Sequence, residues 1–179
     1  MIIGVLMVAA NLVIHESGHA ITAIRFGGQV TSIEFLGMQV YPRVFYHGFH
    51  GFLGQVAYTI VRFGSFGWVT LMGSGTTWLA SIFFLFLIYA LYFLKIRNFV
   101  LETIALFGSL MFLDMLTYIL GLRFTGLQEP LVAAKYLGWN QSLFVASAFT
   151  LGVIQLILLL ICLKKSGYWK YFLSVKGAL

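Results

Sequence analysis

Apolar residues run along this chain in four long stretches, and a basic residue follows each of them. The stretches cover about residues 2–24, 68–94, 99–122 and 143–163. A helix that crosses a bilayer needs about 20 mostly apolar residues, and each stretch is long enough. The pattern therefore predicts about four transmembrane helices.

The segment between the first two stretches, about residues 27–62, has a different pattern. It is rich in glycine, aromatic and β-branched residues, and "QVTSIEFLGMQVYP" alternates in part, which predicts a strand or hairpin. The run "GQVAYTIVRF" is compatible with another short strand or a half-buried helix. Open sheet edges cannot face lipid, so we expect this segment to lie at the membrane interface or to dip into the membrane while shielded by helices. A fifth span around residues 49–72 is the alternative, although Arg62 argues against it.

Composition supports the membrane assignment. The chain is 61% hydrophobic and 9% charged, whereas soluble domains carry about 25% charged residues. We therefore predict an α-helical polytopic membrane protein with a small membrane-associated β-hairpin segment after its first helix, in one domain over residues 1–179. We expect the first helix to be retained rather than cleaved as a signal peptide, because it lacks a basic leading region and contains ionisable residues.

The net charge of +6 does not indicate nucleic acid binding. The basic residues follow the apolar stretches, where they anchor helices against lipid headgroups. The expected partner is thus the lipid bilayer, and we expect a multi-pass protein of the cell membrane. The single cysteine, Cys162, excludes an internal disulfide, and the pattern indicates neither an oligomeric state nor an orientation.

Three ionisable residues, His15, Glu16 and His19, stand inside the first apolar stretch. A charged side chain near the middle of a bilayer costs roughly 2.5–3.5 kcal/mol on insertion scales, so a compensating interaction is needed. The three residues form the motif H-E-x-x-H, in which residues four apart share one helix face and two imidazoles can bind one zinc ion. Zinc lowers the pKa of a bound water toward about 7, and Glu16 is placed to act as the base.

A catalytic zinc site needs a third protein ligand. The remaining candidates are Glu34, His47, His50, Glu102, Asp114 and Glu129. Asp114 is the acidic residue that lies deep within another apolar stretch. Measured from the basic residues that close their stretches, His19 and Asp114 differ in depth by about 4–5 Å at 1.5 Å per residue, so one metal ion could contact both. We predict Asp114 as the third ligand.

Glu129 is the alternative third ligand. It precedes Pro130 at an expected helix start, where a carboxylate usually faces solvent. His47 and His50 lie in "FYHGFHGF", two aromatic–His–Gly repeats that could form a second metal site. Interfacial histidines without a ligand are their more ordinary interpretation, and Glu34 is interpreted as a polar residue of an interfacial strand.

Three sequence features point together to one family. They are "HESGHA" with the following "FGGQVTSIEFLGMQV", the small-residue run "LMGSGTTWLASI", and Leu113-Asp114. Together they resemble the site-2 protease family of intramembrane zinc metalloproteases over about residues 5–120. The family's Gly-Pro and Asn are missing from the second stretch, and Met115 stands where the family has glycine, as in a divergent, minimal member.

The resemblance implies that His15, His19 and Asp114 bind zinc while Glu16 activates water. It implies a zinc metalloendopeptidase that cleaves membrane-embedded segments of transmembrane proteins. A substrate helix would have to unwind first, and we expect the edge of the strand-like segment at 29–41 to pair with it. Two alternatives stay open: a catalytically silent zinc scaffold that binds other membrane proteins, and a small transporter or channel subunit with polar residues through several spans.

Overall fold

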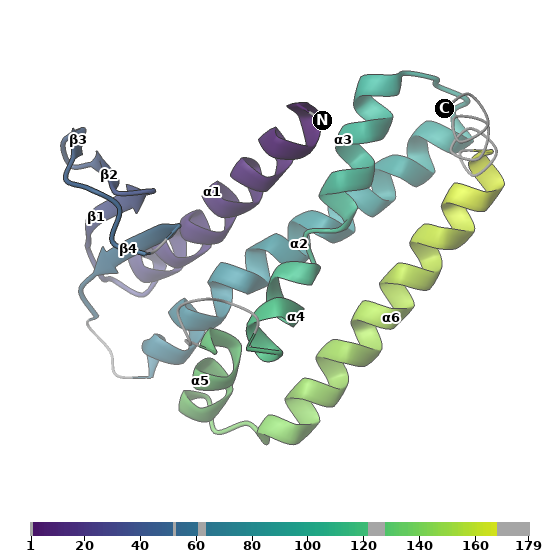
Figure 1. Ribbon diagram of the computed structural model, residues 1–179. Helices are drawn as coiled ribbons and strands as arrows, with labels where there is room; N and C mark the ends of the chain where they lie inside the picture. Colours follow the sequence, from purple (N-terminus) through teal and green to yellow (C-terminus); the bar gives the residue numbers. More distant parts are fainter. Residues whose placement is uncertain (1, 52, 61–63, 122–127, 168–179) are drawn as a thin grey trace.

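The computed structural model describes residues 2–51, 53–60, 64–121 and 128–167. Within these ranges, four helical spans are long and apolar enough to cross a membrane. They are α1 (Ile2–Arg25), α2 (Ser65–Phe93), the combined span of α3 (Phe99–Ser109) and α4 (Leu113–Ile119), and α6 (Gln141–Ser166) (Figure 1). A short helix, α5 (Glu129–Tyr136), lies between α4 and α6. The predicted fold class is confirmed, and a multi-pass membrane protein fits this arrangement.

The third span differs from its prediction because it is broken in the middle. An unbroken helix was expected over 99–122, but α3 and α4 are separated by a turn at residues 110–112. Four backbone N–H groups between residues 110 and 114 bond to the carbonyl three residues back. This is the tighter 3₁₀ pattern, which turns the chain more per residue than an α-helix. The break places Asp114 in the first turn of α4; residue 122 lies outside the described residues.

A four-stranded antiparallel sheet follows α1 within the described ranges. It contains β1 (Val30–Phe35), β2 (Met38–Tyr41), β3 (Phe45–Tyr46) and β4 (Gly54–Tyr58), in the order β3-β2-β1-β4. The predicted hairpin is confirmed: β1 and β2 are joined by Leu36 and Gly37, both at positive φ, as a two-residue hairpin turn favours.

Within the described residues, one alternative for this region is excluded and one expectation is corrected. Residues 54–58 form a strand and α2 begins at Ser65, so the described residues contain no fifth span over 49–72. The strands of the 29–41 segment both have neighbours on two sides. The terminal strands of the described sheet are therefore β3 and β4. Of these two, β4 contacts α1, so a substrate strand that approaches the H-E-x-x-H motif would pair with β4 rather than with the 29–41 segment.

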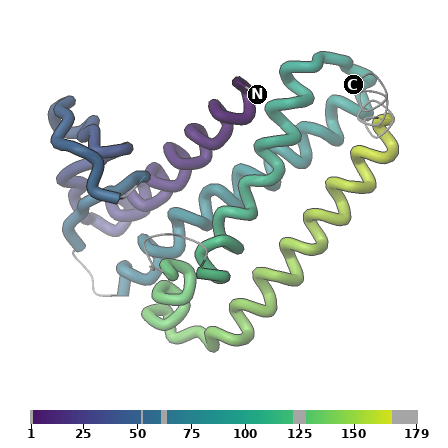
Figure 2. The backbone as a smooth tube through the Cα atoms, viewed as in Figure 1, coloured from purple at the N-terminus to yellow at the C-terminus, as the bar shows by residue number. Residues whose placement is uncertain are grey.

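The long helix α2 is the centre of the bundle. It packs against α1, α3, α4, α5 and α6 (Figure 2). One core cluster joins Leu85 and Ile88 of α2 to Leu159 of α6. At the other end, Leu71 packs with Met115 of α4. The second cluster also contains Ala133 of α5, so it packs α4 and α5 against α2.

The contact between α1 and α2 is close because a glycine lies in it. A side-chain carbon on Gly18 would collide with the backbone carbonyl of Met72 and with the hydroxyl of Thr76. Small residues let membrane helices approach in this way. The Thr76 hydroxyl donates to the carbonyl of Ile14 across the same contact, at 3.1 Å. This approach brings the H-E-x-x-H face of α1 directly against α2.

Candidate metal centre

Three side chains from α1 and α5 converge inside the bundle. The Nε2 atoms of His15 and His19 lie 3.2 Å apart. Glu129, the first residue of α5, places Oε2 3.2 Å from His15 Nε2 and 3.5 Å from His19 Nε2. Both histidines are buried, and the Glu129 side chain is 24% exposed. We call this set the metal centre, because its three ligand atoms lie within 4.8 Å of one another and could hold a metal ion.

The other ring nitrogens of both histidines have fixed partners. His19 Nδ1 lies 2.7 Å from the carbonyl oxygen of Val69, which can only accept, so this nitrogen donates a proton. His15 Nδ1 lies 2.7 Å from Oδ2 of Asp114 and donates to that carboxylate. In metal sites, such partners of the second nitrogen fix the tautomer and the ring orientation. Both Nε2 atoms are therefore left with a lone pair directed at Glu129.

Three electron-pair acceptors that face one another repel unless a positive charge lies between them. A metal ion or an additional proton on an imidazole would supply that charge. Burial alone would raise the pKa of Glu129. In the metal-free protein, where additional protons on the imidazoles can be donated to it, hydrogen bonds with His15 and His19 outweigh burial and lower the pKa of Glu129 to about 2. Glu129 is thus a carboxylate, as a metal ligand must be. The donors present fit a divalent cation.

Gly73 of α2 leaves space at the donor atoms. A side-chain carbon at this position would collide with His19 Nε2 and lie 2.6 Å from His15 Nε2. Gly73 belongs to the small-residue run "LMGSGTTWLASI", and its place beside the two imidazoles gives that run a physical role. Any larger residue here would occupy the place where the two imidazoles converge.

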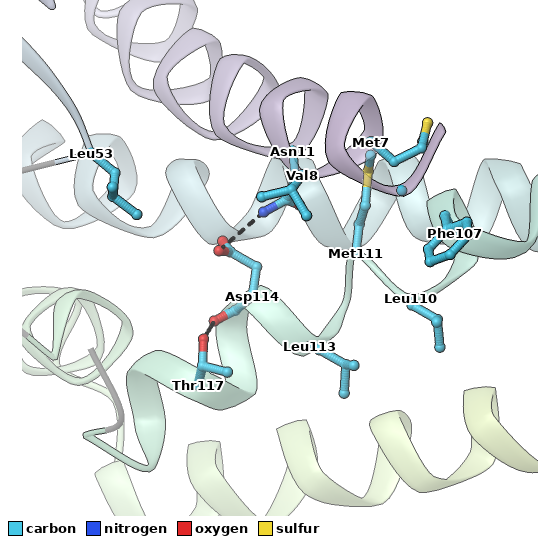
Figure 3. A pocket seen from close by; sticks show the side chains of 11 residues that line it. Met7, Val8, Asn11, Leu53, Phe107, Leu110, Met111, Leu113, Asp114 and Thr117 are labelled. Carbon is cyan, nitrogen blue, oxygen red and sulfur yellow. Dashed lines mark hydrogen bonds between the residues drawn. The ribbon is translucent and has the colours of Figure 1, made fainter. Parts of the chain in front are cut away.

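Asp114 is held by three donors from two helices, α1 and α2. Asn11 of α1 donates its amide N–H to Oδ1 at 3.3 Å (Figure 3). The Thr77 hydroxyl of α2 shares its one proton between Oδ2 of Asp114, at 3.2 Å, and the carbonyl oxygen of Ser74, at 2.8 Å. With His15, the carboxylate of Asp114 has three donors, which suit its ionised, acceptor-only form. These contacts hold His15 in place through Asp114.

The structure brings the predicted ligands together in part. His15 and His19 share the centre, whereas Asp114 lies behind His15, on its Nδ1 side. Asp114 as a zinc ligand stays a prediction; the converging set contains Glu129 instead. Glu129 is not a solvent-facing carboxylate as its helix-start position suggested. The helix α5 buries Ala133 and Ala134 against its neighbours, and this directs its first residue into the bundle.

The predicted base, Glu16, is also buried, with 5% of its surface exposed. Its side chain lies against Gly54, the first residue of β4. A side-chain carbon on Gly54 would lie 2.5 Å from Oε1 of Glu16 and 2.8 Å from its Cγ. The terminal strand β4 therefore passes directly over the carboxylate that follows His15.

A mostly apolar cavity of about 460 Å³ extends from Asp114 along α1. Figure 3 shows it between α1 and the α3–α4 break. Its apolar lining includes Met7, Val8, Leu110 and Leu113, and its polar lining includes Asn11 and Asp114. A cavity of this composition suits apolar side chains and ends at the group that orients a metal-centre histidine.

Sequence reasoning missed several contributors to the centre. The ring of Tyr118 stacks on His15 with centroids 5.3 Å apart. The Val69 carbonyl and the Thr77 hydroxyl fix a histidine and Asp114, respectively. No motif marks such residues, because a backbone carbonyl can come from any residue. Glu102 lies in the first turn of α3, where it pairs with Arg97 at 3.8 Å rather than with the centre.

Comparisons of the chain with protein-family models, curated proteins and solved structures give no match. The function of the protein is therefore inferred from the geometry of the centre.

Proposed function

We propose that this protein is an intramembrane zinc metalloprotease of the site-2 protease type, which hydrolyses peptide bonds in membrane-embedded segments of other proteins. The observation that supports this most is the convergence of His15 Nε2, His19 Nε2 and Glu129 Oε2 inside a helical bundle. The H-E-x-x-H motif supplies a buried glutamate, Glu16, beside the first of these histidines. The four apolar spans favour residence in the cell membrane.

Zinc suits the centre by donor type and by spacing. Imidazole and carboxylate are common zinc ligands. Zinc–ligand bonds of about 2.0–2.1 Å in a tetrahedron separate ligand atoms by about 3.3–3.4 Å. The observed separations are 3.2, 3.2 and 3.5 Å. We propose that His15, His19 and Glu129 hold the ion and that Asp114 orients His15 from behind.

When bound, zinc supplies the Lewis acidity that polarises a peptide carbonyl and acidifies a water molecule. The protein's own contribution is proton transfer. Glu16 takes a proton from the attacking water, whose oxygen forms the new bond to the carbonyl carbon. Glu16 then returns that proton to the nitrogen as the C–N bond breaks. The products are a carboxylic acid and an amine, with no other reactant.

The surroundings of Glu16 suit an extended, apolar substrate. A peptide bond within a helix is already hydrogen-bonded, so the substrate must be unwound around the bond that breaks. The terminal strand β4 lies against Glu16 and can pair with such a segment by strand addition. The apolar cavity beside Asp114 can receive side chains of the same segment.

The scaffold and transporter alternatives differ from the protease in testable ways. A transporter needs ionisable groups spaced along a path through the membrane. Here Asp114 and Glu129 both contact the imidazole of His15, so these groups are gathered in one place. A silent scaffold would keep the metal and have no use for Glu16. We expect Glu16→Gln to keep zinc and to lower cleavage of a membrane-inserted model peptide by about 10²–10⁴-fold. Zinc binding without any cleavage by the wild type would favour the scaffold, whereas full cleavage activity of Glu16→Gln would overturn Glu16 as the base.

The ligand set is tested by tightly bound zinc in the purified protein, measured by elemental mass spectrometry. Glu129→Ala should lose most of the zinc because it removes a ligand. Asp114→Ala should weaken binding by about 10–100-fold, as removal of an orienting partner does. Glu102→Ala is the matched control and should keep the wild-type content. Loss of zinc with Asp114→Ala but not with Glu129→Ala would restore Asp114 as the ligand, and a folded wild type without zinc would overturn the proposal.

A further inference from the structure

A second group of histidine and carboxylate side chains lies on the sheet, apart from the metal centre. Its members are Glu34 of β1, His47 just after β3, and His50 in the following loop; we call them the sheet cluster. His47 Nε2 lies 3.1 Å from Oε2 of Glu34, and His47 Nδ1 lies 3.1 Å from Nε2 of His50. The side chains of His47 and Glu34 are 27% and 20% exposed, so ions in solution can reach them.

The local backbone explains why the two histidines meet. In an extended chain, residues three apart point to opposite faces. Here Gly48 has a φ of +101° and Gly51 a φ of +91°, in the region that favours glycine. The turn at Gly48 brings His50 back beside His47. The backbone N–H of His47 donates to the carbonyl of Gly37 at 3.1 Å, which ties the first histidine to the hairpin.

The hydrogen-bond chain leaves one exchangeable proton in the cluster. Glu34 accepts from His47 Nε2–H, so His47 Nδ1 has a lone pair. That lone pair faces His50 Nε2, and a single proton on His50 completes the contact between the two nitrogens. A metal ion can take the place of this proton if the proton moves to Nδ1 of His50. When both imidazoles are neutral, this is a change of tautomer and releases no proton to the solvent.

We propose that the sheet cluster is a second metal site, which binds a divalent ion of the zinc class through His47 Nδ1 and His50 Nε2. Imidazole nitrogens favour zinc, copper and nickel over magnesium and calcium. Glu34 orients His47 through its other nitrogen, as carboxylates do for histidine ligands in metal sites. The metal centre shows the same pattern, with Asp114 behind His15. Two protein ligands instead of three make this the weaker site.

The sheet cluster lies one strand away from the proposed base. Glu34 pairs with Gln55 in the register of β1 and β4, and the next pair joins Phe35 to Gly54. Gly54 is the residue that packs on Glu16. The second site does not depend on proteolysis, and it can exist whether or not the metal centre cleaves peptides.

The test is a zinc titration of the full chain in detergent, measured by isothermal titration calorimetry. The variant His15→Ala/His19→Ala removes the metal centre and serves as the background, so the two proposals fail separately. In this background we expect one zinc ion to bind per chain. His50→Ala should weaken zinc binding by more than about 100-fold, and Glu34→Gln by about 10–100-fold.

Phe49→Ala is the matched control, because Phe49 lies in the same loop, is 55% exposed and offers no ligand atom. Its zinc affinity should equal that of the background protein. No zinc heat in a folded background protein, or the same heat after His50→Ala, would overturn the second site. If the background variant does not fold, the same variants are made in the wild type, whose metal centre is first loaded with one equivalent of zinc. Further titration should then show a second, weaker binding step that His50→Ala removes. Absence of this second step would refute the site.

Discussion

The metal centre and the sheet cluster use the same residue types in two different settings. In both, a carboxylate holds one nitrogen of a histidine whose other nitrogen faces a second histidine. At the metal centre, both Nδ1 atoms are already bound to fixed acceptors, and a third acceptor, Glu129, faces the Nε2 pair. In the sheet cluster, one shared proton satisfies the pair. The first arrangement requires a cation, whereas the second only permits one.

The two settings also differ in what holds the ligands. Long helices that pack through α2 position the metal centre, so its ligands are oriented before an ion arrives. A glycine-rich loop beside β3 positions the sheet cluster. Ligands fixed in advance lose less conformational entropy on binding. We expect the metal centre to bind zinc more tightly for this reason as well as for its third ligand.

The largest expected difference between the sites comes from Gly73→Ala. The added carbon would lie 2.6 Å from His15 Nε2, so the imidazoles must separate. Zinc affinity of the metal centre should fall by more than about 100-fold, beyond the loss expected from an orienting partner, while the sheet cluster keeps its affinity. Gly75→Ala on the same helix is the control, because its nearest contact is the flexible Met72 sulfur at 3.3 Å. Equal zinc affinities for the two variants would refute the role of Gly73.

A second difference should appear as a pH dependence of stability in the metal-free protein. The folded state lowers the pKa of Glu129 from 4.5 to about 2. A lowered carboxyl pKa stabilises the folded state above the unfolded value, and this stabilisation is lost as pH falls through the folded value. The free energy of unfolding in detergent should therefore decrease between about pH 4.5 and 2. Glu129→Gln should show a smaller decrease; an identical pH profile would contradict the assigned interaction.

A smaller effect is expected from Thr77→Val, which removes one of the donors that hold Asp114. Its effect on zinc passes through Asp114 and then His15, so we expect no more than about a tenfold loss of affinity at the metal centre. The control is Thr103→Val, because the Thr103 hydroxyl bonds to a carbonyl of its own helix. Zinc titrations of the two variants make the comparison. A loss as large as that of Glu129→Ala would mean that Asp114 itself is a ligand.

The smallest expected effect concerns the loop of the sheet cluster. Gly48→Ala adds a carbon that meets no atom within 4 Å, but it places alanine at a φ of +101°. Only part of the backbone strain of about 1–3 kcal/mol at such a φ acts on the bound state, so zinc binding at the sheet cluster should weaken by no more than a few-fold. Gly64→Ala, which is equally open but has a φ of −70°, should have no effect on this titration. Equal affinities would show that the turn does not orient His50.

The sequence predicts the elements better than the site. The length of the apolar stretches predicted the four spans. Alternating apolar and polar residues, together with glycine, predicted the hairpin. Both signals lie in short, continuous pieces of sequence, so they can be recognised without the tertiary structure. The contact between α1 and Asp114 also followed from depth along two spans. Depth along a helix does not determine which nitrogen of His15 a carboxylate contacts. The roles of Asp114 and Glu129 could therefore be assigned only from the three-dimensional structure. The break at residues 110–112 contains neither proline nor glycine, and no local pattern marks it.

The wide spacing of the converging residues has a consequence for how the protein is made. His15 and His19 enter the membrane with the first helix, whereas Glu129 is synthesised more than 100 residues later. A growing chain therefore carries two imidazoles without the third donor until α5 has left the ribosome and docked against α2. With His15, His19 and Glu129 as the proposed ligands, a partly synthesised chain lacks a complete zinc site. Hydrolytic activity is then delayed until nearly all of the bundle has assembled.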